Sequence, residues 1–464
     1  MRTRLVSSVA ALLTGTGLAL GQTGPANSEP RTTSLGNAVP PSVAPALMDS
    51  HPAAADEKRA DACPPSELPP APFDPGFGVW IPNGPNAFSP PEPKCSPFDI
   101  YGPDRFFFRG EYLLWWVREQ PVPGPLVTTG TPASGGALGQ GTSILFGDGG
   151  IDYGPLSGGR FFIGMTSCNH AWALEAGALL LETGSAGFGA SSDAAGNPVL
   201  ARPVIDVLNN NQEIGVPVSS PGAFAGSIAV KTKTDLTGAE LNLWRYCDTG
   251  CWGPTVGFLV GFRYLFLQES MAIAQDTSVL AGGVAAFNGN IVLAPATLGI
   301  TDTFDTRNDF YGGQVGMQLD FHPGRFFGTV TGKLGIGSTH EVVNNFGRSS
   351  LTDATGTTTV PGGLLAVQGN SGLSSRNEFT LVPEVALNVG IEVTRNWRLF
   401  VGYTFLYWDD VVRPGSQFNR AVNTALVPTS FNFGSGMGGP TASSMGDHTQ
   451  FWAQGFSAGA AFRY

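Results

Sequence analysis

The stretch Phe310-Tyr-Gly-Gly-Gln-Val-Gly-Met-Gln-Leu-Asp-Phe321 is the clearest example of an alternation that recurs along most of the chain. Successive side chains of a β-strand point to opposite faces, so residues two apart share a face. One face of this stretch holds Tyr311, Gly313, Val315, Met317, Leu319 and Phe321, and the other holds Gly312, Gln314, Gly316, Gln318 and Asp320. The pattern predicts a strand with one apolar face and one polar face.

The same period of two recurs from Arg105 to the last residue, and it predicts about ten strands, with twelve as the alternative count. Their expected ranges are about 105–118, 157–166, 170–188, 231–246, 254–273, 303–322, 325–345, 375–394, 396–412 and 450–464. The connections alternate in length. Short ones lie at 167–169, 247–253, 323–324 and 395, and long ones rich in Gly, Ser, Thr and Asn lie at about 119–156, 189–230, 274–302, 346–374 and 413–449.

An even strand number with alternating short and long connections is typical of outer-membrane barrels. Closure of the sheet removes the unpaired edges that lipid cannot satisfy. A soluble sandwich, the alternative, would use turns of more similar length. We therefore expect an all-β, transmembrane, antiparallel up-and-down barrel in the cell outer membrane.

Composition agrees with that class and excludes others. Only 13% of the 464 residues are charged, against about 25% in an average soluble protein. No window of about 18 purely apolar residues follows the N-terminus, so a helical membrane protein is excluded. The net charge of −11 argues against nucleic acid as a partner, because nucleic-acid binders carry a basic stripe.

The N-terminal region differs from the rest of the chain. Residues 1–21 combine Arg2 and Arg4, a short apolar run and a small-residue site at Ala19-Leu20-Gly21, which predicts a signal peptide. Residues 22–104 hold more than half of the 36 prolines, so we expect a disordered Pro-rich periplasmic arm. The barrel is expected over residues 105–464.

Charged side chains on the strands are expected to face the lumen, because a charge that faces lipid costs about 2–4 kcal/mol at the midplane. The set is Arg109, Glu111, Glu175, Glu240, Arg263, Lys333, Glu384, Glu392 and Arg398. Two interpretations stay open: a pore lining that selects ions, or a salt-bridged network that fills a narrow barrel. Aromatic residues near strand ends are expected to form interfacial girdles, namely Trp115, Trp116, Trp172, Trp252, Trp397, Trp408 and Trp452.

Several segments resemble the planctomycete outer-membrane barrels of the beta-barrel porin-7 family. They include Glu111-Tyr-Leu-Leu-Trp-Trp116, Pro125–Gly130, Ser157-Gly-Gly-Arg160, Gly238–Asn242, Gly261-Phe-Arg-Tyr264, Arg307–Gln314, Pro361-Gly-Gly-Leu-Leu365, Pro383-Glu384, Phe400–Trp408, Val412-Arg-Pro-Gly415 and Phe451–Gly455. The resemblance covers about residues 105–464 and leaves out the arm. It implies an outer-membrane barrel with porin in its name, and it brings no catalytic residues or substrate.

The remaining chemistry is sparse. Asp409, Asp410, Asp447 and His448 lie near one rim of the predicted barrel, where such groups could activate water. Adjacent Asp409 and Asp410 point to opposite faces, however, so we expect no enzymatic activity. The histidines show no metal-ligand spacing, and we expect no metal or other cofactor.

The five cysteines all fall in the arm or in short turns, which would face an oxidising periplasm. Cys247 and Cys251 flank one turn, and we expect a disulfide between them, with a metal site as the alternative. Pairing among Cys63, Cys95 and Cys168 stays open.

The resulting functional hypothesis is a porin-like outer-membrane barrel with a narrow charged lumen for passive passage of ions or small solutes. The alternative is a non-conducting structural or adhesive barrel that displays long extracellular loops. Expected partners are outer-membrane lipid, the barrel-assembly machinery through the C-terminal strand, and cell wall or a periplasmic protein through the arm.

Overall fold

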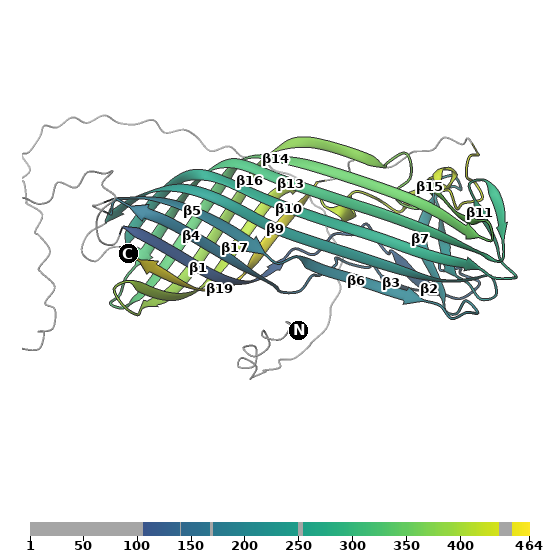
Figure 1. Ribbon diagram of the computed structural model, residues 1–464, viewed down its shortest axis with the longest axis horizontal. Coiled ribbons are helices and arrows are strands. Elements are labelled where there is room, and N and C mark those ends of the chain that lie inside the picture. The colour runs from purple at the N-terminus through teal and green to yellow at the C-terminus, as the bar shows by residue number, and fades with distance from the viewer. Residues whose placement is uncertain (1–104, 140, 168–169, 249–253, 436–447) are drawn as a thin grey trace, which may run out of the picture. The chain divides into compact units, whose positions relative to one another are not determined.

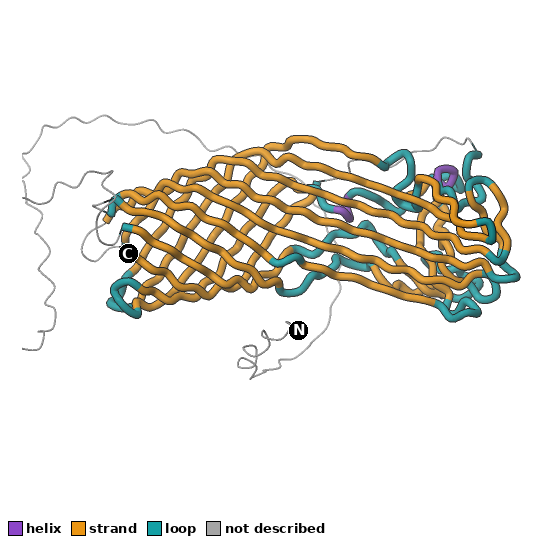
Figure 2. The backbone as a smooth tube through the Cα atoms, viewed as in Figure 1, coloured by secondary structure: helices purple, strands orange, loops and turns teal. Residues whose placement is uncertain are grey.

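Ten antiparallel strands close into a barrel, as Figures 1 and 2 show for the computed structural model. They are β1 (Phe106–Val117), β4 (Leu156–Thr166), β5 (Trp172–Leu181), β9 (Phe224–Asp248), β10 (Thr255–Val279), β13 (Ala296–Phe321), β14 (Phe326–Asp353), β16 (Gly372–Glu392), β17 (Trp397–Val411) and β19 (Thr449–Arg463). Each strand pairs with the next one around the ring, and β19 pairs with β1 to close it. The predicted ten-stranded up-and-down barrel is therefore confirmed.

The structure describes residues 105–139, 141–167, 170–248, 254–435 and 448–464. All of them belong to one of two compact units of the chain, Phe73–Tyr464. The predicted signal peptide and Pro-rich arm, residues 1–104, lie outside the described residues.

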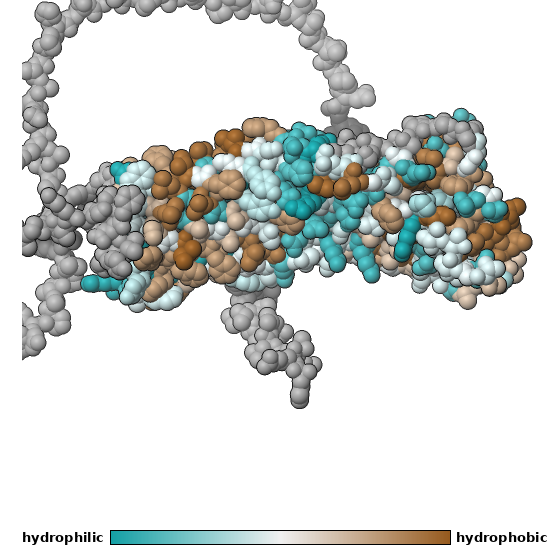
Figure 3. Space-filling view, turned by 45° about the horizontal axis from the view of Figure 1, so that its top comes forward, coloured by the Kyte–Doolittle hydropathy of each residue, from teal (hydrophilic) through white to brown (hydrophobic). Residues whose placement is uncertain are grey.

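An apolar belt surrounds the part of the barrel nearest the short turns. On β13 it runs from Tyr311 to Phe321, and the outward side chains Val315 and Met317 are about half exposed. At about 3.4 Å per residue and a tilt of about 40°, this stretch spans about 26 Å of height. That height matches the apolar band of about 25 Å on outer-membrane barrels. Figure 3 shows the hydrophobic residues gathered over the same part of the surface. We call this part of the barrel the membrane half.

Four strands continue far beyond the belt. β9, β10, β13 and β14 have 25, 25, 26 and 28 residues, whereas β1, β4 and β5 have 12, 11 and 10. Above Tyr311 the outward side chains of β13 become polar, as at Thr303 and Asp305. Since long loops of these barrels are extracellular, we call the region above the belt the extracellular half.

The long connections are not simple loops, which corrects the expectation from sequence. Three of them supply a second sheet, made of β2 (Val127–Gly130), β3 (Thr142–Phe146), β7 (Val199–Asp206), β8 (Gln212–Ser219) and β18 (Ala421–Val422). The others carry β11 (Val284–Phe287), β12 (Asn290–Leu293) and β15 (Gly356–Pro361). Two short 3-10 turns, η1 (Pro414–Ser416) and η2 (Thr424–Leu426), complete the described elements. Neither of these turns is long or apolar enough to cross a membrane.

The second sheet packs inside the extracellular half. Leu200 and Val204 of β7 share one buried cluster with Met271 of β10 and with Ile300 and Phe304 of β13. Burying this apolar surface is what makes the long connections fold. The expected strand 170–188 also divides: β5 ends at Leu181, and β6 (Gly184–Ser191) continues along β9.

Candidate functional site

The interior of the membrane half holds the charged side chains that the sequence singled out. Glu111 and Arg160 face each other across β1 and β4, with Arg160 Nε and Nη2 donating to Glu111 Oε2 at 3.1 and 2.7 Å. Arg160 Nη1 donates to Glu384 Oε1 at 3.2 Å, and Arg263 pairs with the other oxygen of Glu384. Two carboxylates and two guanidinium groups thus form one chain of ion pairs across the lumen. Arg109 extends it, with its Nε 3.2 Å from Glu111 Oε1.

A second group lies beside the first. Lys333 Nζ is 2.7 Å from Glu240 Oε1, and Gln314 Nε2 donates to Glu240 Oε2 at 2.9 Å. Glu175 Oε1 accepts from Asn242 Nδ2 and from the indole of Trp244, both at 3.2 Å. Each buried carboxylate is therefore paired or hydrogen-bonded, which is what a charge removed from water requires.

The last predicted pair lies at the rim near the short turns. Glu392 and Arg398 are cross-strand neighbours on β16 and β17 and form a partly exposed ion pair. The structure thus places all nine predicted charges on the inward face, and it brings Arg109, Glu111, Arg263 and Glu384 into one chain.

These charges are shielded from solvent. The side chains of Glu111, Glu384, Arg263, Lys333 and Glu240 are 0, 4, 6, 6 and 10% exposed. The cavity between Arg160, Glu240, Arg263 and Glu384 measures ≈ 20 Å³, which is room for about one water molecule. Within the described residues these charges are therefore packed against one another with little access to solvent.

A hydrophobic layer lies above the charges, toward the extracellular half. It contains Trp115, Phe310, Trp408 and Phe451, none of which is exposed. The indole nitrogen of Trp408 donates to Thr339 Oγ1 at 3.0 Å. This layer separates the charged network from the extracellular half.

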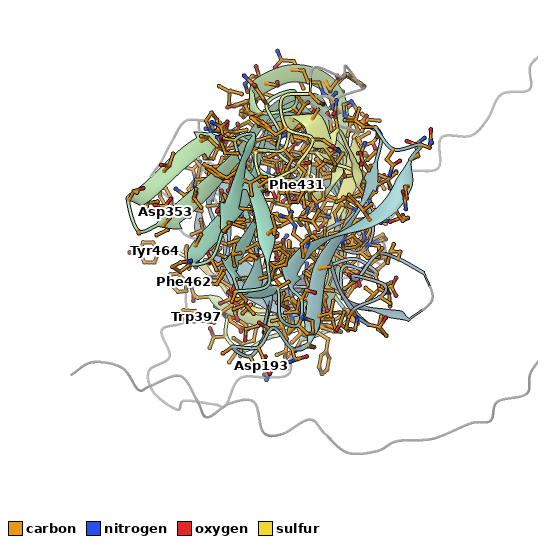
Figure 4. All side chains as sticks on the ribbon, turned by 90° about the vertical axis from the view of Figure 1, so that its right-hand side faces the viewer. Asp193, Asp353, Trp397, Phe431, Phe462 and Tyr464 are labelled. Atoms are coloured by element: carbon orange, nitrogen blue, oxygen red, sulfur yellow. The ribbon has the colours of Figure 1, made fainter. Side chains whose placement is uncertain are left out.

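The prediction that Trp115 and Trp408 belong to an interfacial girdle is therefore wrong. Trp115 and Trp408 lie in the lumen, because consecutive strand residues face opposite sides. Trp116 faces outward, so its neighbour Trp115 faces inward. Trp397 also faces outward, and Trp408, an odd number of residues further along the same strand, faces inward. Trp172 and Trp397 are outward and about half exposed, and Trp397 packs against Phe462 with ring centroids 4.9 Å apart (Figure 4). Trp116 and Trp452 are partly buried on the outer face, and Trp252 lies outside the described residues.

Buried polar anchors, which sequence reasoning missed, hold the extracellular half together. Asp302 is 0% exposed; it pairs with Arg202 of β7 at 2.7 Å and accepts from the backbone N–H groups of Leu365 and Ala366 at 2.9 and 2.8 Å. A Cβ at Gly363 would overlap the Asp302 carboxylate. The segment Pro361–Leu365 that carried the family resemblance therefore requires glycine here for packing.

A second anchor joins two more of those segments. Arg413, fully buried, donates from Nε and Nη2 to Glu269 at 2.7 Å each. Asn308 holds the neighbouring backbone, donating to the Val412 carbonyl at 2.8 Å and accepting from its N–H at 2.9 Å. The sequence could have shown that Glu269 and Asn308 occupy inward-facing positions of their strands. It could not have shown their partners, which lie more than 100 residues away in the chain.

The rim residues considered for catalysis are only partly within the described chain. Asp447 lies outside it. His448 Nδ1 is 3.4 Å from Glu341 and 2.9 Å from Arg376 Nη2, and burial raises the pKa of the Glu341 carboxyl although Arg376 opposes this. Across the described ranges, no three His, Cys, Asp or Glu side chains are grouped to hold a metal ion.

Cys247, the one cysteine within the described residues, is a free and exposed thiol at the end of β9. This does not support the predicted disulfide with Cys251. Cys251, like Cys63, Cys95 and Cys168, lies outside the described residues.

Residues 107–464 match the family model described as "Putative beta barrel porin-7 (BBP7)". The chain belongs to this family. The match covers every strand of the barrel and confirms the resemblance found in the sequence. Together with the closed ring and the apolar belt, it assigns this member of the family to the outer membrane. No curated protein matches the chain.

Among solved structures, the chain is similar to the outer membrane protease OmpT from Escherichia coli, with 10% identity, a TM-score of 0.34, and coverage of 78% of this chain and 97% of that one. It is also similar to the ΔS2S3 mutant of the TodX monoaromatic hydrocarbon channel (9%, 0.19, 78% and 91%) and to the ΔS2 mutant of that channel (10%, 0.20, 78% and 90%). The expectation that the chain is no enzyme is corrected by the first match, which is a protease. None of these matches assigns an activity or functional residues to this chain.

Proposed function

We propose that this outer-membrane barrel is closed and serves to hold a folded extracellular domain at the cell surface. The observation that carries the proposal is the burial of the lumen charges: the paired groups around Glu384 are at most 10% exposed, around a cavity of ≈ 20 Å³. A lining that selects ions in water needs accessible charges. A narrow barrel near the eight-strand size is instead filled by its own side chains.

The extracellular half supports the display role. The described parts of its connections fold into a second sheet with its own buried cluster, so they present a folded surface. Beside it, the β11–β12 hairpin exposes Val284, Ile291 and Leu293 by 48, 72 and 61%. Exposed apolar side chains gathered on one element are typical of a contact surface.

The second candidate is a narrow pore for ions or small solutes. Two observations favour it: the family description contains the word porin, and charged residues cross the lumen. In that case the network around Glu384 would be a gate that opens, and its charges would set the ion selectivity.

Conductance of the refolded full chain in a planar bilayer separates the two. We expect no stable unitary steps from protein whose folding is verified by heat-dependent gel migration. The matched variants are Arg263→Ala and Glu384→Ala in the network, with Phe456→Ala on the lipid face as the control. Stable steps in the unmodified chain, with an ion selectivity that moves in the two network variants and not in the control, would overturn the proposal in favour of the pore.

A further inference from the structure

A pocket of ≈ 570 Å³ opens where β1 ends and β19 begins. Trp116 and Trp452 line it together with Arg118, Glu119 and Asp152. The two indoles come from neighbouring strands: Trp116 pairs with Gln454, and the Arg118 N–H donates to the Trp452 carbonyl at 2.9 Å. The pocket therefore combines two aromatic side chains with one cationic and two anionic groups.

The pocket lies on the outer face of the wall, at the upper edge of the apolar belt. Trp116 shares its face with Tyr112 and Leu114, and Trp452 shares its face with Phe456; these three neighbours are exposed outward. From Phe106 to Trp116 the strand has the same length as from Tyr311 to Phe321, about 26 Å in height. The pocket thus sits at the level of the lipid headgroups of the outer leaflet.

The charges of the pocket are arranged around its opening. Glu119 and Asp152 are exposed. A Cβ at position 150 would overlap the Glu119 carboxylate, so Gly150 provides the space that this carboxylate occupies. Asp152 uses Oδ1 to accept from the Gly154 N–H at 2.9 Å. Arg118 uses Nη1 to donate to the Gln450 carbonyl at 2.8 Å. Two carboxylates therefore outnumber one anchored guanidinium.

The backbone behind these side chains is held in place. Arg413 donates to the carbonyl oxygens of Arg118 and Glu119 at 3.1 and 2.7 Å. Gln120 and Ile151 exchange two backbone hydrogen bonds of 2.9 Å, which fixes the segments that carry Glu119 and Asp152 side by side. A site whose groups are positioned before binding loses less entropy when a ligand arrives.

We propose that this pocket binds the headgroup of a zwitterionic phospholipid of the outer leaflet. The ammonium group lies against the indoles of Trp116 and Trp452 and the carboxylates of Glu119 and Asp152, because cations are attracted to Trp faces and to acidic groups. The phosphate lies toward Arg118. A headgroup with a phosphate and no ammonium meets two carboxylates and is disfavoured. The site goes beyond the display role and does not depend on whether the lumen conducts.

Native mass spectrometry of the full chain tests the site. The refolded protein is released from micelles that contain equal amounts of phosphatidylcholine and phosphatidylglycerol with identical acyl chains. We expect one retained lipid and a preference of about fivefold for phosphatidylcholine. In the Glu119→Gln/Asp152→Asn double variant, and independently in Trp452→Leu, the preference should fall to near one.

Trp397→Leu, which removes an outward Trp at the opposite rim, is the matched control and should keep the full preference. Equal or stronger retention of phosphatidylglycerol by the unmodified protein would overturn the proposal. A preference that survives in both the carboxylate double variant and Trp452→Leu would also overturn it, provided that gel migration shows each variant to be folded. Conductance of the same samples is a separate readout, so failure of this site leaves the display proposal standing.

Discussion

The two halves of the barrel use the same strands with opposite polarity. On β13 the membrane half turns Val315 and Met317 outward and Gln314 inward, whereas the extracellular half turns Thr301 and Thr303 outward and Ile300 and Phe304 inward. The physical reason is the solvent on the outside. Lipid favours apolar outer side chains and leaves the polar ones to pair within, while water favours polar outer side chains and drives the apolar ones into a core.

The difference explains how each half is filled. In the membrane half, ion pairs such as Arg160–Glu111 fill the narrow lumen directly from the wall strands. In the extracellular half the wall alone leaves apolar residues such as Met271 facing inward, and a second sheet from the long connections covers them. Four predictions test this contrast.

The buried ion pair between Arg413 and Glu269, which anchors the extracellular half, should be the position most sensitive to mutation. Arg413→Ala leaves Glu269 charged and unpaired at 0% side-chain exposure, and we expect the free energy of unfolding to fall by about 3–5 kcal/mol. Denaturant unfolding of the folded protein in micelles measures this. The Arg413→Met/Glu269→Leu double variant should recover most of the loss; if it is as unstable as the single variant, the pair does not act as proposed.

Outward charges should distinguish the two halves directly. Val315→Lys places an ammonium group on the lipid face of β13 and should lower the free energy of unfolding by about 2–4 kcal/mol. Thr303→Lys, the matched variant on the same face of the same strand, should change it by less than about 0.5 kcal/mol. Equal costs at the two positions would contradict the assignment of the belt.

The apolar core of the extracellular half should respond to the loss of one methylene group. Ile300 is 3% exposed among β7, β9 and β10 residues, and Ile300→Val should lower the free energy of unfolding by about 1 kcal/mol. The same unfolding assay detects this change. No loss at all would indicate that the second sheet does not pack against the wall.

A pH effect is expected from Glu341 in the extracellular half. Burial raises the pKa of this carboxyl above its ordinary value of 4.5, so the native state binds the proton more tightly than the unfolded state does. The stability from this proton is present below about pH 4.5 and is lost as the pH rises through the raised pKa.

Glu341→Gln removes this dependence. The unfolding free energy of the variant, relative to the unmodified protein, should therefore rise between pH 4 and pH 7. A difference that stays constant or falls over that range would show that Arg376 and His448, which face Glu341, outweigh its burial.

The inward charges could be predicted from the sequence, because the alternation of faces along a strand identifies its inward residues once the strand is recognised. Glu111 and Arg263 follow from the outward aromatic neighbours on their strands. Arg160 could have been included on the same ground, since Phe161 and Ile163 beside it face outward. The pairing of Arg413 with Glu269 could not, because no local pattern reports contacts between residues so far apart in the chain.

The period of two and the alternating connection lengths were enough to predict an up-and-down barrel of about ten strands and to say which side chains share a face. The contacts that fill the interior became visible only in the folded structure. Whether Glu384 meets water or two arginines, and whether the long connections fold inward, both depend on contacts between residues far apart in the chain. Local periodicity carries no information about such contacts, because they are set by barrel closure and by the packing of one sheet inside another.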